Sequence, residues 1–232
     1  MRQRLNKLIA HSGLCSRRKA DELILKGKVK INGSIVLTPG ISADPDKDKI
    51  TVNNTPLMQE KMVYILLHKP PGYITTTKDA HADKTVLSLL PKLPVRLYPV
   101  GRLDKDTSGL LIMTNDGQLR FKLTHPKFEV DRVYEVVIRK PLPEDIVNKI
   151  EKGGLQIDDY KTYPCKIKIL SRTKTTTTLR IILHEGRKRQ IRKVFSSFGH
   201  PVIELKRVQF GKLHLGDLKP GKWRFLKKSE II

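Results

Sequence analysis

Six segments rich in β-branched and aromatic residues constrain the fold more than any other feature of this sequence. They read VYILLHK, RLYPVG, LLIMT, RVYEVVI, CKIKIL and TTTTLRIIL, and each has the length and composition of a strand. Only EDIVNKIEKGG and RQIRKVFSSFG between and after them have helical spacing. Because strands and helices do not alternate regularly, the pattern predicts an α+β fold with a larger mixed, mainly antiparallel-sheet domain over residues 61–232.

Residues 1–60 have a different pattern and predict a small domain of their own. Leu5, Leu8 and Ile9 share one helical face, and Ser16 is placed to cap a second helix. The stretch VKINGSIV alternates around an Asn-Gly pair, which predicts a hairpin with a type I′ turn. A polar turn and a short strand follow, so we expect the domain boundary near residue 60.

The net charge of the chain identifies the class of partner. Lys and Arg exceed Asp and Glu by 23 charges, and residues 1–30 alone hold nine basic residues against two acidic ones. Such a field attracts polyanions, and nucleic acid is the leading candidate. A membrane surface is a weaker one, because the basic helices lack bulky aromatic residues and no apolar run is long enough to span a bilayer. No signal peptide is evident, so a cytoplasmic location is expected.

Two cysteines, Cys15 and Cys165, are 150 positions apart. This spacing predicts neither a disulfide framework nor a zinc knuckle, and the seven histidines form no ligand cluster. We therefore expect no metal and no cofactor. Monomer is the default oligomeric state.

One acidic segment, GRLDKDTSGLLIMTNDG at residues 101–117, contrasts with the basic character of the chain. Its Asp104 lies beside Arg102 and Lys105. The plainer interpretation is a carboxylate paired with these neighbours on a surface turn. The alternative is that the strand-like flanks, above all the apolar run LLIM, hold Asp104 at the edge of a sheet. Nearby cations would keep its carboxylate ionised there, as nucleophilic attack requires.

A calcium site is the other chemistry that this segment suggests. Asp104, Asp106, Ser108 and Gly109 match the first half of an EF-hand loop, but Asn115 stands where that loop needs a bidentate Glu. The strand-like flanks also differ from the helices of an EF-hand. The calcium interpretation is therefore rejected.

Four segments in order resemble the family of RNA pseudouridine synthases of the ribosomal small-subunit synthase A type. The acidic segment at 101–117 is similar to the family signature. HKPPGYITTTKD (68–79), LTHPKFEVDRVYEVVI (123–138) and EGRKRQIRKVFSSFGHPVIELKRVQFG (185–211) are similar to its other segments. Residues 4–36 resemble the S-four-type RNA-binding domain that many members carry in front. The resemblance implies a pseudouridine synthase catalytic domain over residues 61–232.

The resemblance also implies roles for particular residues. Asp104 matches the family's catalytic aspartate, Tyr134 the tyrosine that packs against the target base, Arg192 the basic residue that pairs with the aspartate, and Leu205 the apolar residue of the pocket. Arg132 departs from the pattern, since the family usually has Lys two positions before the tyrosine. The positive charge is kept, but Arg is a planar donor rather than a point charge, so the detailed role of this position stays open.

Spacing alone supports the placement of Arg192. Ile191, Val194, Phe195 and Phe198 form an apolar stripe at i, i+3, i+4 and i+7, which predicts a core-facing helix. Arg192 lies at the edge of this stripe, where its stem can be buried while its guanidinium reaches a partner.

RNA contacts are expected from basic residues in both predicted domains. Arg102 would fill the gap that a flipped nucleotide leaves, and Lys69 with Gly72 would shape the loop over the site. Solvated charge and a plain Pro-Gly turn are the corresponding simpler interpretations. The candidate RNA-binding residues are Arg4, Arg17, Arg18, Lys19, Lys69, Arg102, Arg132, Arg187, Lys188 and Arg189.

The resemblance therefore implies site-specific isomerisation of uridine to pseudouridine in ribosomal RNA or an assembling ribosomal subunit, with large-subunit rRNA slightly favoured over small-subunit rRNA. The aspartate could attack the base or the ribose, and both routes stay open here. A non-catalytic RNA-binding factor of ribosome assembly would explain the charge and the first domain equally well. It would not explain why Asp104, Tyr134 and Arg192 occur together.

Overall fold

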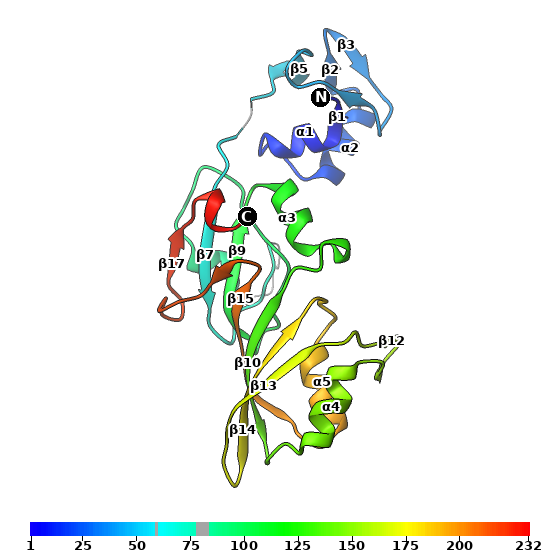
Figure 1. Ribbon diagram of the computed structural model, residues 1–232. Coiled ribbons are helices and arrows are strands. Elements are labelled where there is room, and N and C mark those ends of the chain that lie inside the picture. The colour runs from blue at the N-terminus through cyan, green and yellow to red at the C-terminus, as the bar shows by residue number, and fades with distance from the viewer. Residues whose placement is uncertain (59, 78–83) are drawn as a thin grey trace. The chain divides into compact units, whose positions relative to one another are not determined.

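The computed structural model (Figure 1) describes residues 1–58, 60–77 and 84–232. The end of the segment HKPPGYITTTKD lies outside the described residues. The chain forms two compact units, each described separately below. Unit 1 comprises Met1–Val63, Leu93–Leu97 and Asn115–Gly117, and unit 2 comprises Tyr64–Lys92, Tyr98–Thr114 and Gln118–Ile232. The border near residue 60 between two independently folding domains stays a prediction.

Unit 1 packs two short helices against a small antiparallel sheet. Ser16 accepts a hydrogen bond from the Lys19 backbone N–H and so caps the second helix, as predicted. Asn32 and Gly33 both have positive φ, as the predicted type I′ turn requires. Its elements are β1 (Gln3–Arg4), α1 (Leu5–His11), α2 (Arg17–Leu25), β2 (Val29–Ile31), β3 (Ser34–Val36), β4 (Ser42–Ala43), β5 (Ile50–Val52) and β6 (Thr55–Pro56).

Unit 2 is built on a sheet that confirms the mainly antiparallel prediction. Within the described residues the sheet has nine strands, and its main order is β13-β14-β10-β15-β9-β7-β17. Among the described residues its strand pairings are antiparallel except that of β15 with β9. The strands are β7 (Tyr64–Lys69), β8 (Tyr98–Pro99), β9 (Ser108–Thr114), β10 (Arg132–Arg139), β13 (Lys166–Arg172), β14 (Thr176–Leu183), β15 (Val202–Phe210), β16 (Leu213–His214) and β17 (Trp223–Phe225).

Helices and short hairpins complete the chain. The two helices expected from their spacing are α4 (Glu144–Lys152) and α5 (Gln190–Ser197). The strand β15 and the helix α3 (Gly117–Thr124) were not among the predicted elements. Short elements are η1 (Val86–Leu89), β11 (Gln156–Ile157), β12 (Tyr160–Lys161), η2 (Pro126–Phe128) and η3 (Lys228–Glu230).

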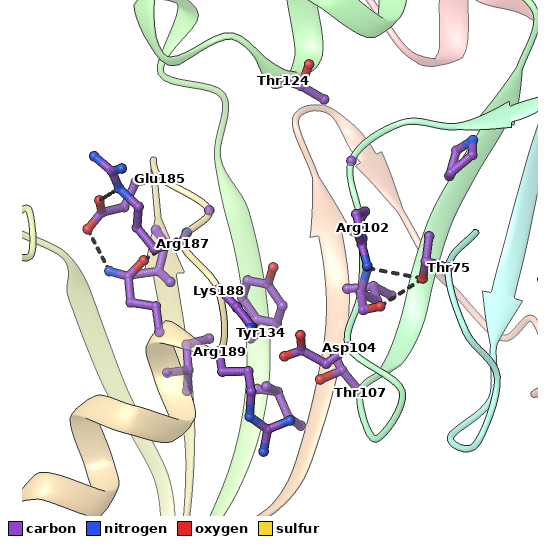
Figure 2. A pocket seen from close by; sticks show the side chains of 18 of the residues that line it. Thr75, Arg102, Asp104, Thr107, Thr124, Tyr134, Glu185, Arg187, Lys188 and Arg189 are labelled. Atoms are coloured by element: carbon purple, nitrogen blue, oxygen red, sulfur yellow. Dashed lines mark hydrogen bonds and ion pairs between the residues drawn. The ribbon is translucent and has the colours of Figure 1, made fainter. Parts of the chain in front are cut away.

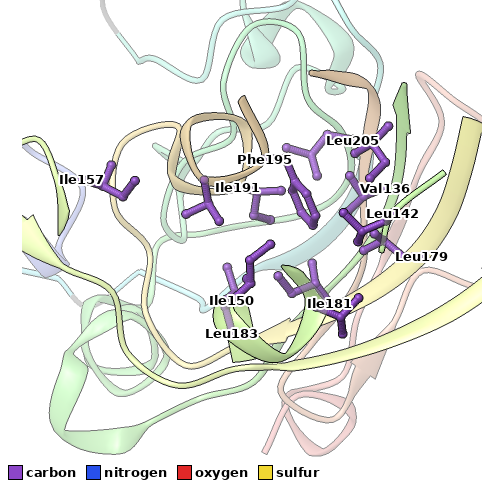
Figure 3. Packing of buried hydrophobic residues seen from close by; sticks show 13 residues of the cluster. Val136, Leu142, Ile150, Ile157, Leu179, Ile181, Leu183, Ile191, Phe195 and Leu205 are labelled. Carbon is purple, nitrogen blue, oxygen red and sulfur yellow. The ribbon is translucent and has the colours of Figure 1, made fainter. Parts of the chain in front are cut away.

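The core that positions half of unit 2 lies between α4, α5 and one face of β10, β14 and β15. Figure 3 shows Ile191 and Phe195 of α5 packed among residues of these strands, and Phe195 has no exposed surface. Val194 belongs to the same buried cluster and Phe198 packs against it. The apolar stripe predicted for this helix is thus confirmed. Because Leu205 of β15 is part of the cluster, the core anchors a strand that also reaches the candidate site.

The sheet depends on a glycine at its one parallel junction among the described strands. Gly109 of β9 pairs with Arg207 of β15 and has φ +108°, a conformation that L side chains rarely adopt. A Cβ atom built there would lie 2.2 Å from the Arg207 carbonyl oxygen. Only glycine therefore lets the two backbones approach, and the strand that follows Asp104 can pair with the strand that carries Leu205.

Gly109→Ala should destabilise the fold strongly. The added methyl group collides with a backbone atom and adds strain at positive φ, so we expect a loss of about 3 kcal/mol or more in the free energy of unfolding. Urea unfolding at constant m-value measures it. Gly216→Ala is the matched control: Gly216 also has positive φ but open space around its Cβ position, so a loss of about 1 kcal/mol is expected. Equal losses for both would contradict the close-approach explanation.

Candidate active site

A pocket of about 850 Å³ opens in unit 2 beside the junction of β9 and β15. Its size is within the range of small-molecule sites and suits a nucleotide. In the view of Figure 2 the Asp104 carboxylate points toward the ring of Tyr134, with Arg189 nearby. Residues that the sequence singled out and that line this pocket are Arg102, Asp104, Tyr134, Arg187, Lys188, Arg189 and Leu205.

A buried ammonium group binds the backbone of the loop that carries Asp104. Lys69 of β7 has no exposed surface, and its Nζ donates hydrogen bonds to the carbonyl oxygens of Pro70 (3.0 Å), Lys105 (3.1 Å) and Thr107 (2.8 Å). These bonds use the three hydrogens of the group. An RNA contact by Lys69 is therefore wrong, because its charge is committed to the loop. The expectation that it shapes the loop agrees with this geometry.

Burial has a second effect on this lysine. It lowers the pKa of Lys69 to about 8, against the opposing influence of the Asp106 and Asp104 carboxylates, which favour the charged form. The ammonium is thus kept charged at neutral pH by its neighbours in the loop. The loop and the lysine stabilise one another.

A hydroxyl group fixes the residue immediately before Asp104. Thr75 is buried, and its Oγ1 donates to the Leu103 carbonyl oxygen at 2.8 Å and accepts from the Leu103 N–H at 3.3 Å (Figure 2). Both backbone groups of Leu103 are thereby satisfied by one side chain. Sequence reasoning missed Thr75, since a threonine in a strand-like stretch carries no distinct signal.

Tyr134 and Leu205 come from neighbouring strands and form the wall opposite the loop. In the β10–β15 pairing Leu205 lies opposite Val136, two residues along from Tyr134. Tyr134 is half-buried and packs against the α4–α5 core, while Leu205 is 6% exposed. Each side chain therefore contributes to both the core and the pocket, so the simple interpretation of Tyr134 as a strand residue and its role in the pocket are compatible.

Arg192 reaches the Asp104 loop, but not in the expected way. Its Nη2 donates to the Asp106 carbonyl oxygen (3.1 Å) and its Nη1 to the Val202 carbonyl oxygen (3.2 Å). Among the residues that the structure describes, no basic group forms an ion pair with the Asp104 carboxylate, so the implied Arg192–Asp104 pair is not made directly. Burial lowers the pKa of Arg192, and the nearby Asp106 and Asp104 charges oppose that shift.

The three basic residues before α5 are exposed and line the pocket. Arg189 is also 3.6 Å from the Asp106 carboxylate.

A buried acid that sequence reasoning missed, Glu185, holds the loop that carries these three basic residues. Its carboxylate accepts from Gln190 Nε2 at 2.6 Å and from the Tyr163 N–H at 2.9 Å. Because both ends of the loop are joined by the Glu185–Gln190 bond, its cations are presented in one place. The only signal was an acidic residue opening a basic run.

Arg132 is buried, which makes its predicted contact with RNA wrong. Its guanidinium donates to the carbonyl oxygens of His184 (2.9 Å) and Leu123 (3.3 Å) and lies over the Phe210 ring, 5.3 Å from its centre. Burial also lowers its pKa. The planar guanidinium joins three segments through directed hydrogen bonds and a stacked face, so Arg132 is a packing residue here.

The four candidate RNA-binding residues of unit 1 are exposed. Arg17, Arg18 and Lys19 form the first turn of α2, and Arg4 precedes α1. Lys19 pairs with Glu22 at 2.7 Å, with both side chains more than half exposed, so this ion pair contributes little to stability. Basic side chains at the positive end of a helix oppose the helix dipole, and a bound polyanion would relieve this.

In residues 1–58, 60–77 and 84–232, no group of three or more His, Cys, Asp or Glu side chains is placed to hold a metal ion. Over the same residues no helix is long and apolar enough to cross a membrane. Cys15 and Cys165 are free thiols.

Lys69→Met should loosen the Asp104 loop. The change removes three hydrogen bonds from an ammonium to loop carbonyls in a buried setting, so we expect a loss of about 2–4 kcal/mol in the free energy of unfolding. Lys105→Met is the matched control: this exposed lysine lies on the same loop, and its change should cost less than about 0.5 kcal/mol. Urea unfolding of both variants measures the difference.

The same pair of proteins yields a pH prediction. The pKa of Lys69 is about 8 in the folded protein and near 10.5 when the chain unfolds, so between these values the unfolded chain holds a proton that the folded protein lacks. Raising the pH then favours the folded state. The stability of the native protein relative to Lys69→Met should rise between pH 8 and 10.5, by at most about 1.4 kcal/mol per pH unit. A difference that stays constant or falls would contradict the lowered pKa.

The chain is similar to known proteins in both sequence and structure. The RNA pseudouridylate synthase family matches residues 63–197, and the S4 domain family matches residues 3–46. A ribosomal large subunit pseudouridine synthase B from Bacillus subtilis (strain 168) is 43% identical over 231 residues, which cover 99% of this chain and 94% of that protein. An uncharacterized RNA pseudouridine synthase from Aquifex aeolicus (strain VF5) is 38% identical over 232 residues, covering 100% of this chain and 93% of that protein.

A solved structure supports the same assignment. A crystal structure of pseudouridylate synthase superposes with a TM-score of 0.71 at 30% identity and covers 98% of this chain and 97% of that one. The fold expected from the four segments, an S4 domain followed by a pseudouridine synthase domain, is thereby confirmed. Since the family match spans more than half of the chain and the relatives align over nearly all of it, the chain belongs to the RNA pseudouridylate synthase family.

Proposed function

We propose that this protein converts a uridine of large-subunit ribosomal RNA into pseudouridine, in the cytoplasm, with Asp104 as the nucleophile. The observation that carries the proposal is the Asp104 carboxylate in a nucleotide-sized pocket, facing Tyr134 and surrounded by basic residues (Figure 2). The other acid that lines the pocket, Glu185, is bonded to Gln190 and to the Tyr163 N–H. The choice of large-subunit RNA is supported by the Bacillus subtilis relative, a ribosomal large subunit pseudouridine synthase B.

The proposed reaction is an isomerisation that balances without a co-reactant. The bond between ribose C1′ and uracil N1 breaks, the base turns within the pocket, and C1′ bonds to C5. The proton on C5 leaves and N1 gains one. No electron is transferred overall and no water is consumed, so the residues of the chain suffice to carry and position the reacting groups.

Asp104 would form a covalent link that holds one part of the substrate while the base turns. Attack at uracil C6 and attack at ribose C1′ both use the same carboxylate oxygen and the same loop position. Either route needs a base taken out of its helix stack, because neither atom can be reached inside a duplex. The hydrogen bonds from Lys69 and Thr75 hold the loop before the substrate enters, which lowers the entropic cost of the attack.

Tyr134 and Leu205 would bind the extruded base. The Tyr134 ring offers a flat stacking surface, and its hydroxyl is the candidate acceptor for the C5 proton. Leu205 would pack against the other parts of the base and exclude water there. Their shared support from the α4–α5 core fits a rigid wall against which the base can turn.

Arg192 and Arg102 would act around the nucleophile. Arg192 holds the loop through the Asp106 carbonyl oxygen and places a positive charge near Asp104, although it forms no ion pair with that carboxylate. Arg102 is exposed at the pocket, where it could occupy the space left by the flipped nucleotide. Arg187, Lys188 and Arg189 would contact the phosphates that flank the target.

Unit 1 would bind structured RNA through contacts that do not depend on the RNA sequence. Its match to the S4 domain family and its exposed residues Arg4, Arg17, Arg18 and Lys19 support this. Contacts of this kind make affinity fall steeply with salt.

Asp104→Asn is the decisive variant. Tritium release from ribosomal RNA labelled at C5 of uridine should fall by at least about 10⁴-fold, because the amide cannot act as the nucleophile. RNA affinity and its salt dependence should stay unchanged, since no phosphate contact is removed. Asp106→Asn is the matched control. It makes the same change two residues away on an exposed side chain outside the pocket lining, and release should change by less than about fivefold.

Two results would contradict the proposal. Tritium release retained by Asp104→Asn would exclude this carboxylate as the nucleophile. A native protein that binds ribosomal RNA but alters no uridine, in isolated RNA or in assembling subunits, would instead favour a non-catalytic assembly factor.

Pseudouridine mapping should locate the target. We expect one or more sites in large-subunit ribosomal RNA to be lost when the gene is deleted and restored by the native gene but not by Asp104→Asn. Loss confined to small-subunit RNA would leave the chemistry in place and overturn the choice of subunit.

A further inference from the structure

An aromatic cluster on unit 2 is not used by the proposed chemistry. Phe121 of α3 and Phe128 of η2 are 47% and 41% exposed, although burial of aromatic rings is strongly favourable. Their ring centres are 5.8 Å apart and the ring planes are nearly perpendicular, at 89°. His125 completes the cluster at 4.7 Å from Phe121. We call Phe121, His125 and Phe128 the aromatic corner.

The chemistry around the aromatic corner favours a polyanionic partner with flat rings. The ammonium of Lys127 lies 5.4 Å from the Phe121 ring centre and 4.8 Å from that of Phe128. Residues 118–129 hold three basic residues against one acidic residue. Two exposed rings beside an exposed cation match the way that proteins bind unpaired nucleotides, with the base stacked on a ring and the phosphate near a lysine. A protein partner would be expected to meet a more continuous apolar surface.

The aromatic corner adjoins the candidate active site. Arg120 and Thr124, four residues apart on one side of α3, both line the pocket, and Thr124 appears at its upper rim in Figure 2. Phe121 and His125 follow each of them by one position, about 100° around the helix. Arg120 also lies over the Tyr98 ring, 5.7 Å from its centre, and Tyr98 is a further lining residue. The pocket and the aromatic corner thus share one helix.

We propose that the aromatic corner stacks an unpaired base of the substrate RNA near the flipped uridine, with Lys127 moving to the adjoining phosphate. The perpendicular rings explain why one base would be held in a defined orientation: a base stacked on one ring meets the other ring edge-on. This inference rests on the proposed function and adds a specificity contact to it, since an RNA paired at that position could not enter the corner.

Phe121→Ala and Phe128→Ala test the proposal in the full chain. Each should weaken binding of the mapped ribosomal RNA fragment by about five- to 100-fold. In single-turnover tritium release the loss should fall mainly on the half-saturating RNA concentration, and the salt dependence should keep its slope, because no charge changes. Phe121→Trp should bind RNA about as tightly as the native protein, since the larger ring still stacks.

Phe225→Ala is the matched control for loss of an exposed ring. Phe225 on β17 is 54% exposed and forms an edge-to-face pair with Trp223, yet it does not line the pocket. This variant should bind RNA like the native protein. Thermal unfolding of all variants separates misfolding from loss of a contact. If Phe121→Ala binds poorly because it is misfolded, its melting temperature should fall well below that of the native protein. A Phe121→Trp protein that melts like the native protein but binds RNA as weakly as Phe121→Ala would overturn the proposal.

Stacking itself is read out by 2-aminopurine placed in turn at the unpaired positions that flank the target uridine. Quenching at one position in the native protein and in Asp104→Asn, lost in Phe121→Ala, is expected. Should no uridine be converted, so that the proposed function fails, the probe becomes oligouridine with a central 2-aminopurine. Quenching that depends on Phe121 would then support the aromatic corner alone.

Two outcomes would overturn the inference. Unchanged RNA binding and quenching in Phe121→Ala and Phe128→Ala, with catalysis intact, would remove the aromatic corner from RNA recognition and leave the proposed function standing. Concentration-dependent dimerisation in sedimentation velocity that Phe121→Ala abolishes, with RNA binding intact, would show that a second copy covers the rings.

Discussion

The architecture of unit 2 depends on one close contact between backbones. At Gly109 the strand β9, which follows the acidic loop, runs beside β15, which carries Leu205. A side chain at this position would collide with the carbonyl oxygen of Arg207. Because this junction joins the β7–β9 half of the sheet to the β10–β14–β15 half, the pocket exists only where the two halves meet. A glycine without chemistry of its own therefore determines where the chemistry can occur.

The loop above that junction is stabilised by an unusual use of charge. In a chain with an excess of 23 basic residues, Lys69 is taken out of solvent and made to hold three carbonyl oxygens. Burial disfavours the ammonium and lowers its pKa to about 8, but its three hydrogens are all bonded and the Asp106 and Asp104 carboxylates are near, so it stays charged at neutral pH. The result is a loop whose shape is present before substrate arrives, as the proposed attack by Asp104 would require.

Much of the fold could be predicted from local patterns. The Ser16 cap, the Asn-Gly hairpin, the helix α5 and six strands follow from capping chemistry, turn preference and hydrophobic spacing, all of which act over a few residues. The strand β15 and the helix α3 did not follow. Charged and apolar residues are mixed in VIELKRVQF, and the apolar residues of α3 alternate instead of forming a helical stripe. In both, packing against distant segments outweighs the local preference.

The sequence by itself determined the residue types of the site: one carboxylate on a glycine-containing turn, a tyrosine on a strand, and a run of cations before a helix. It also determined the nucleic-acid class of partner through net charge. Tertiary structure decided which cations face solvent. Lys69 and Arg132 look like RNA ligands in the sequence, but long-range backbone carbonyls bind them inside the protein, and Arg192 meets a carbonyl oxygen and not the Asp104 carboxylate. Partners that lie tens of residues away in the chain leave no local pattern, so only the folded structure could identify them.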